Sequence, residues 1–165
     1  MTMTKEPSRR HLLRGQFSAQ SINAPLRPPG AIEESLFISA CTRCGECISA
    51  CPELIIEKTD GGYPSIDFSL RGCTGCGACQ QACPTLALSQ PDQKWPSGIA
   101  VIEESCLAHK GVTCQSCKDS CESSDVIRFS WQDRTPIPVI NAERCTGCGE
   151  CVAVCPTSSI DVKQI

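Results

Sequence analysis

The chain has 165 residues, of which 16 are cysteine and only 4% are aromatic, and its formal net charge is −3. A chain of this length can form one or two small domains, but so few aromatic side chains leave a conventional apolar core thin. Apolar runs stay well short of the roughly 18 residues that a transmembrane helix needs, so no membrane span is expected. Cysteine is strongly over-represented relative to average proteins, and we expect cysteine chemistry to govern both stability and function.

Residues 1–30 are predicted to form a basic, flexible N-terminal arm. They contain five basic residues and one acidic residue, whereas the rest of the chain has ten basic and seventeen acidic residues. A basic arm therefore precedes an acidic body, for which no nucleic-acid partner is expected. Ser8-Arg9-Arg10 resembles the start of a twin-arginine export signal, but the apolar stretch of about 7–15 residues that should follow is replaced by Gly15-Gln16-Phe17-Ser18. A docking arm or a plain tail is favoured over export.

The first predicted unit, residues 31–90, begins with a first quartet of cysteines followed by Pro52: Cys41, Cys44, Cys47 and Cys51. The spacing C-x2-C-x2-C-x3-C-P is the one with which bacterial ferredoxins bind [4Fe–4S] clusters. Backbone N–H groups in such a loop can face an anionic cofactor. Gly45, directly after the second cysteine, permits the positive φ that brings the backbone close. This pattern predicts a cluster site.

A β-hairpin is predicted after the first quartet, with strands at Leu54–Lys58 and Tyr63–Phe68. Thr59-Asp60-Gly61-Gly62 has the composition of a turn, and Pro64 indicates an edge position. The hairpin leads to a second quartet with the same spacing, followed by Pro84: Cys73, Cys76, Cys79 and Cys83. Leu86–Leu88 is expected to be the closing strand of this unit.

Residues 91–98 are rich in turn-forming residues and are predicted to be a linker. Trp95 is expected to cover the edge of a core. Ile99–Ile102 is predicted to be the first strand of a second unit, residues 99–165.

The third quartet in this unit is altered, because seven residues separate its first two cysteines and Glu122 replaces the proline: Cys106, Cys114, Cys117 and Cys121. A fourth [4Fe–4S] cluster is expected here, with a labile or three-iron site, or no cluster, as alternatives. His109 is expected at the surface rather than as a ligand.

A second hairpin is predicted from Val126–Trp131 and Ile137–Ile140, and Ile160–Val162 as a closing strand. The fourth quartet, followed by Pro156, has the regular spacing: Cys145, Cys148, Cys151 and Cys155. The second unit thus repeats the first. The predicted fold class is α+β, small and dominated by metal clusters, with two tandem two-cluster ferredoxin-like units and short hairpins.

Zinc and disulfides are the alternative uses of these cysteines. Zinc sites typically use two separated C-x-x-C pairs rather than a triple followed by C-x3-C-P. A disulfide framework needs an oxidising compartment and a secretory signal, which the N-terminal residues do not match. Both are disfavoured against clusters.

The chain resembles the NapF family, ferredoxin-type accessory proteins of the periplasmic nitrate reductase system. The resemblance rests on Ser8-Arg9-Arg10, Arg27-Pro28-Pro29, Gly61-Gly62-Tyr63-Pro64-Ser65 and above all the altered third quartet with Cys114-Gln115 and Asp119-Ser120-Cys121-Glu122. It implies a cytoplasmic location. The implied partner is the catalytic subunit of periplasmic nitrate reductase in its cytoplasmic precursor form, and the implied role is maturation, by loading or reducing that subunit's own cluster.

The residues themselves indicate one-electron chemistry, since each cluster takes one electron. A general acid–base pair is not evident, so a non-enzyme electron or cluster carrier is expected. An electron-transfer subunit and a structural or iron-sensing adaptor are the alternatives to the maturation role. Within each unit, the fourth cysteine of each quartet is expected to complete the other quartet's site, as in two-cluster ferredoxins. The alternative is a nested scheme that pairs the outer quartets and the inner quartets.

Overall fold

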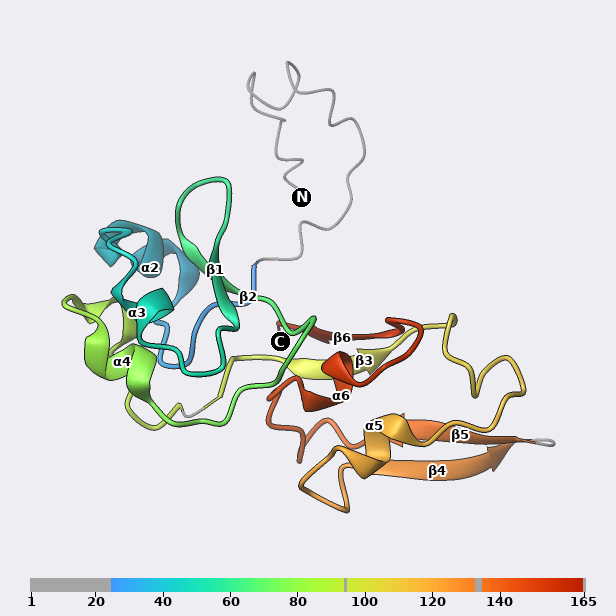
Figure 1. Ribbon diagram of the computed structural model, residues 1–165. Coiled ribbons are helices and arrows are strands. Elements are labelled where there is room, and N and C mark those ends of the chain that lie inside the picture. Colours follow the sequence, from blue (N-terminus) through green and yellow to red (C-terminus); the bar gives the residue numbers. More distant parts are fainter. Residues whose placement is uncertain (1–24, 94, 133–134, 165) are drawn as a thin grey trace, which may run out of the picture.

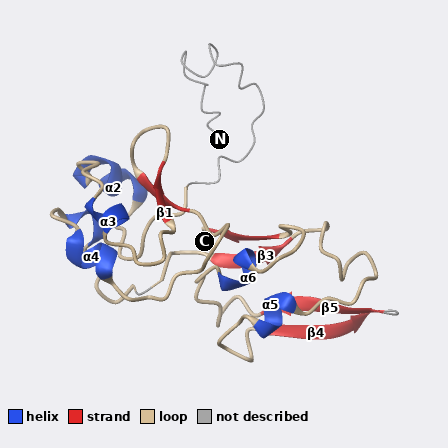
Figure 2. Cartoon of the chain, in the orientation of Figure 1, coloured by secondary structure: helices blue, strands red, loops and turns tan. Residues whose placement is uncertain are grey.

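The structure is a computed structural model and describes residues 25–93, 95–132 and 135–164 (Figure 1). Its helices are α2 (Glu34–Ala40), α3 (Glu46–Ser49), α4 (Ala78–Ala82), α5 (Ser116–Asp119) and α6 (Glu150–Ala153), with a 3₁₀ helix, η1 (Leu86–Leu88). Its strands are β1 (Ile56–Lys58), β2 (Pro64–Ile66), β3 (Ile99–Ile102), β4 (Ile127–Gln132), β5 (Thr135–Ile140) and β6 (Ile160–Lys163). All are short, and loops make up much of the chain (Figure 2). The described helices include none with the length and apolar character to cross a membrane.

The strands form three separate two-stranded antiparallel sheets. In the first half of the molecule, β1 pairs with β2 so that Ile56 lies opposite Ile66. In the second half, β4 pairs with β5 so that Ile127 lies opposite Ile140. β3 pairs with the last strand, β6. Both predicted hairpins and the strand at Ile99–Ile102 are confirmed, and the two halves lie side by side in Figure 1.

The predicted strand at Leu86–Leu88 is wrong, because these residues form η1. The Thr85 hydroxyl accepts a hydrogen bond from the Ala87 N–H at 3.3 Å and so begins a helical turn. Ala87 and Leu88 are buried together while Leu86 is exposed, which does not follow the alternation of a strand. Residues 30–32 still hydrogen-bond to residues 87–90, in the place where β3 and β6 pair in the second half.

Four one-turn helices and α2 were not anticipated by the sequence pattern. α3, α4 and α6 each begin directly after the glycine that follows the second cysteine of a quartet. α2 is capped by Glu33, whose carboxylate accepts a hydrogen bond from the Ser35 N–H, and the helix buries Phe37 completely. Helices of four to seven residues carry too few turns to show a hydrophobic period.

Residues 25–30 belong to the folded body, although their charge and proline content predict an arm that extends to residue 30. Leu26 and Arg27 are buried, and the Leu26 carbonyl accepts a hydrogen bond from the Ile66 N–H at 2.8 Å. The remainder of the predicted arm, including the twin-arginine resemblance at Arg9 and Arg10, lies outside the described residues.

One apolar core runs through both halves, and cysteine is a large part of it. Five of the buried apolar residues are cysteines: Cys47, Cys51, Cys79, Cys117 and Cys151. The other buried members are mostly aliphatic residues, with Phe37 and Phe68 as the aromatic ones among the described residues. The thiol groups are therefore part of the packed core itself and do not lie at its edge.

Candidate metal-cluster sites

Three thiols of the first quartet and one of the second surround a single cavity, which we call site A: Cys41, Cys44, Cys47 and Cys83. Phe37 and Leu88 line the same cavity. Burial, together with the neighbouring Cys41 and Cys83, raises the pKa of the Cys47 thiol to about 11. The fourth cysteine of the second quartet thus completes the first quartet's site.

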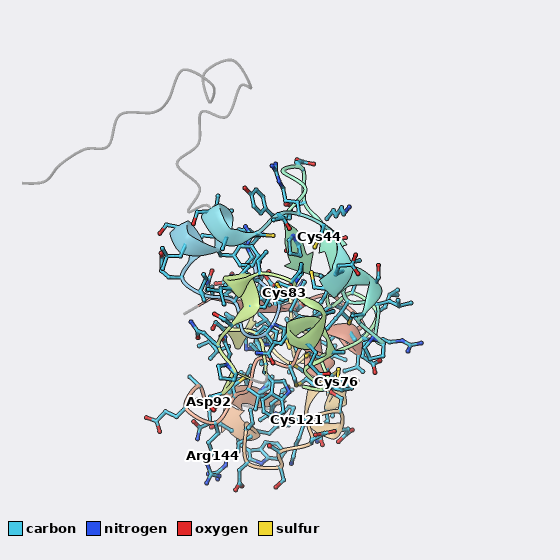
Figure 3. The ribbon with its side chains drawn as sticks, turned by 90° about the vertical axis from the view of Figure 1, so that its left-hand side faces the viewer. Cys44, Cys76, Cys83, Asp92, Cys121 and Arg144 are labelled. Carbon is cyan, nitrogen blue, oxygen red and sulfur yellow. The ribbon has the colours of Figure 1, made fainter. Side chains whose placement is uncertain are left out.

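The reciprocal arrangement forms site B: Cys51, Cys73, Cys76 and Cys79. Burial raises the pKa of Cys79 to about 12, with Cys73 and Cys51 adding to the effect. The Gly75 N–H donates a hydrogen bond to the Cys73 sulfur at 3.4 Å, as expected for a loop whose amides face an anionic group. In Figure 3, Cys44 and Cys83 lie toward one end of the molecule, and Cys76 lies between them and Cys121.

Site C is in the second half and has the same crossed composition: Cys121, Cys145, Cys148 and Cys151. Its cavity has a volume of about 220 Å³ and is also lined by Cys73 and Trp95 from outside the second unit. Burial raises the pKa of Cys151 to about 12, and Cys148 and Cys145 contribute to the rise. The Ala100 N–H donates to the Cys145 sulfur at 3.4 Å.

Three thiols of the altered quartet lie close together in what we call site D: Cys106, Cys114 and Cys117. By analogy with the crossed sites A to C, Cys155 of the fourth quartet is expected to be the fourth ligand. Burial raises the pKa of Cys117 to about 11, and Cys106 and Cys114 add to it. Ser159 links Cys155 to the Cys106 loop, because its N–H donates to the Cys155 sulfur at 3.2 Å and its hydroxyl accepts from Ser105 at 2.8 Å. Burial opposes ionisation of Cys155, but the hydrogen bonds from Ser159 and Thr157 outweigh it and lower the pKa.

The inserted loop of the altered quartet is compact. The Lys110 N–H donates to the Cys106 carbonyl at 3.2 Å, and the Val112 N–H to the Leu107 carbonyl at 2.9 Å. Ala108 is buried beneath the turn, while His109 is exposed, as predicted. The insertion therefore returns the chain to Cys114 without displacing the remaining three cysteines of the quartet.

The four groups fit [4Fe–4S] clusters better than the alternatives. All 16 cysteines are described and none forms a disulfide. The cysteine spacing, a triple followed by C-x3-C-P, differs from the two separated C-x-x-C pairs typical of zinc sites. Gly45, Gly77 and Gly149 have φ of 89°, 74° and 83°, so the residue after the second cysteine has a positive φ in all three regular quartets.

Some residues around the sites were not predicted. The Thr85 and Thr157 hydroxyls lie 3.6 and 3.8 Å from the sulfurs of Cys83 and Cys155. Both threonines stand in the same repeated Cys-Pro-Thr sequence, which was a usable signal. Ser159 had no such signal, because its importance depends on contact with a segment far away in the chain.

Removal of iron and sulfide should leave the chain unfolded or molten. Much of the core is thiol, and the binding free energy of a structural metal is also folding free energy. We expect circular dichroism of the apoprotein to show lost secondary structure and near-ultraviolet signal, and restoration on anaerobic reconstitution. A spectrum close to that of the holoprotein after complete iron removal would contradict this expectation.

Comparisons with known proteins agree with this geometry. A family model described as a 4Fe-4S dicluster domain matches residues 40–87 and 110–159, one segment in each half. The ferredoxin-type protein NapF of Escherichia coli (strain K12) is 37% identical over 163 residues, covering 99% of this chain and 98% of that protein. NapF of Haemophilus influenzae is 40% identical and covers 99% of both chains. The ferredoxin-type protein NapG of E. coli is 32% identical over 91% of this chain and 74% of its own length.

Proposed function

Because this chain belongs to the NapF family of ferredoxin-type proteins, we propose that it is an iron–sulfur carrier in which sites A to D each hold one [4Fe–4S] cluster. The crossed thiol groups around the cavities support this assignment most directly. A bound cluster supplies one-electron redox chemistry. The chain supplies the thiolates, the amide donors to sulfur and the apolar walls that limit water.

We further propose that the protein acts in the cytoplasm on the precursor of the periplasmic nitrate reductase catalytic subunit, and assists its maturation by loading or reducing that subunit's own cluster. The family resemblance motivates this role. We propose a carrier rather than an enzyme, because the related proteins are named ferredoxin-type proteins and a 4Fe-4S dicluster model matches both halves.

An asymmetry between the halves supports docking through the first half. Leu54 and Leu86, each the third residue after the last cysteine of a quartet, have exposed fractions of 83% and 74%. The corresponding residues in the second half are the serines Ser124 and Ser158. Cys44 and Cys76, one in site A and one in site B, are also exposed. Exposed apolar side chains, in the half that also exposes these two thiols, are typical of a docking surface.

Binding to the precursor is expected to weaken at least tenfold in the Leu54→Ser, Leu86→Ser double variant, because about 1.4 kcal/mol of apolar contact corresponds to that factor. Val139→Ser is the matched control, since Val139 is half exposed and lies on β5 in the second half. Anaerobic pull-down or interferometry with the purified precursor measures the affinity. A truncation of residues 1–24 tests the basic arm and leaves the buried Leu26 and Arg27 in place.

If the full-length protein does not bind the precursor, the maturation role is wrong. The alternative is an electron-transfer subunit, which the exposure of Cys44 and Cys76 also favours. That alternative predicts rapid oxidation of the reduced protein by a redox partner in stopped-flow mixing, without a stable complex.

A further inference from the structure

A hydrogen bond joins the ligand loops of the two halves. The Cys73 N–H donates to the Cys148 carbonyl at 2.6 Å, so that a backbone amide of site B meets a backbone carbonyl of site C. A bond of this length is at the short end of the N–H···O range.

Close packing surrounds this hydrogen bond. Phe68 is buried and its ring lies directly against Gly149, where a Cβ would overlap the ring. A Cβ on Gly72 would lie 2.7 Å from the Glu150 backbone nitrogen. Two features therefore favour glycine at position 149: its φ is positive, and the Phe68 ring of the other half leaves no space for a Cβ. We call Phe68, Gly72, Cys73, Cys148 and Gly149 the junction.

The corresponding glycines of the first half have no such neighbour. A Cβ on Gly45 would meet the end of the Lys58 side chain at 3.5 Å, and one on Gly77 the end of Gln80 at 3.6 Å. The cluster motif alone therefore does not account for the crowding at Gly149. The contact is specific to the meeting of the two halves.

The linker covers the junction. Trp95 lies against Gly75, with its Cε2 3.0 Å from the position of a Cβ there, and it also lines the cavity of site C. Gly147 lies against the linker backbone: a Cβ at this position would overlap the carbonyl oxygen of Gly98 and lie 3.1 Å from the carbonyl oxygen of Pro96. Backbone from the linker thus packs on the same loops that the Cys73–Cys148 bond joins.

We propose that the junction orders the four sites in one row, A–B–C–D, and sets the magnetic and electrostatic coupling between the two halves through sites B and C. This inference rests on the proposed cluster binding. α3, which carries Cys47, packs against α4, which carries Cys79, and α5 with Cys117 packs against α6 with Cys151. Site A is thus adjacent to site B within the first half, and site D to site C within the second, which puts sites A and D at the ends of the row. The order in space differs from the order along the chain, where the altered third quartet precedes the fourth.

The test compares two phenylalanine variants of the holoprotein. Phe68→Leu loosens the junction, whereas Phe129→Leu, the control, makes the same change at a half-buried ring on β4 that belongs neither to the junction nor to a cavity of sites A to C. Anaerobic hydrogen exchange of the peptide containing Cys73, whose N–H is the donor, is the first measurement. We expect this peptide to exchange about tenfold faster in Phe68→Leu, the effect of losing one hydrogen bond, and to keep its wild-type rate in Phe129→Leu.

Electron paramagnetic resonance of the fully reduced proteins, at equal iron content, is the second measurement. We expect part of the spin–spin broadening to disappear in Phe68→Leu and to remain in Phe129→Leu. The inference is overturned if the Cys73 peptide exchanges freely in the wild type, or if both variants give the same spectrum while only Phe68→Leu shows faster exchange. A protein without iron would contradict the proposed function, whereas the exchange measurement would still test the junction.

Discussion

Replacing Cys83 with Ser is expected to empty site A and leave site B filled, although Cys83 belongs to the second quartet. The Cys83 side chain lines the same cavity as Cys41, Cys44 and Cys47, whereas Cys79 lies in site B with Cys51, Cys73 and Cys76. Loss of one thiolate from a buried cluster site leaves iron without a ligand and, we expect, reduces the iron content by about four atoms per chain. Iron, acid-labile sulfide and Mössbauer spectra of anaerobically purified protein measure this loss.

Double variants show which thiols share a site, because losses at one site do not add and losses at two sites do. Cys44→Ser combined with Cys83→Ser should lose no more iron than either variant alone. Cys76→Ser combined with Cys83→Ser should lose about eight atoms, since it damages sites A and B together. The reverse pattern, with Cys76 and Cys83 behaving as one site, would show that each quartet keeps its own fourth cysteine.

The cysteine quartets could be predicted from sequence because they follow from local chemistry, whereas their crossed pairing was expected only by analogy with two-cluster ferredoxins, with a nested scheme as the alternative. The spacing of each cysteine run, the glycine after its second cysteine and the proline after its fourth constrain a few neighbouring residues, and such constraints are visible in the sequence. The hairpins were predictable for the same reason, since Asp60-Gly61 marks a turn between short apolar runs.

Contacts between distant segments could not be predicted in this way. Phe68 has the appearance of an ordinary strand residue, yet it packs on Gly149 in the other half. Leu86–Leu88 is a different case, because its composition is that of a strand while the adjacent Thr85 hydroxyl begins a 3₁₀ helix there. For Phe68, the deciding partner is a group that no local pattern identifies.

Arg27 shows the same limit most clearly, because its charge counts toward the basic arm while its side chain is 93% removed from solvent. Its guanidinium donates two hydrogen bonds to Glu34, at 2.7 and 3.0 Å, and one to the Pro64 carbonyl at 2.8 Å. It also lies over the Phe37 ring, 4.8 Å from the centroid. One side chain thus ties the segment before the first unit to α2 and β2.

Replacing Arg27 with Ala should therefore destabilise the first half by about 2–4 kcal/mol. Removing one partner of a buried ion pair typically costs about 3–5 kcal/mol, and the partial exposure of Glu34 lowers this figure because water can solvate its carboxylate. Arg27→Lys should recover little, since an ammonium group cannot reproduce the bidentate fork. The expected shift is roughly 5–15 °C in the midpoint of anaerobic thermal loss of cluster absorbance, measured at one scan rate.

Arg71→Ala is the control for this prediction. Arg71 is 65% exposed and lies 3.5 Å from Glu53, and a surface pair of this kind contributes about 0–1 kcal/mol. Its midpoint should stay close to that of the wild type. If Arg27→Ala shifts the midpoint no more than Arg71→Ala does, the buried guanidinium does not hold α2 against β2. The stability of the first half would then depend on its thiols and aliphatic contacts alone.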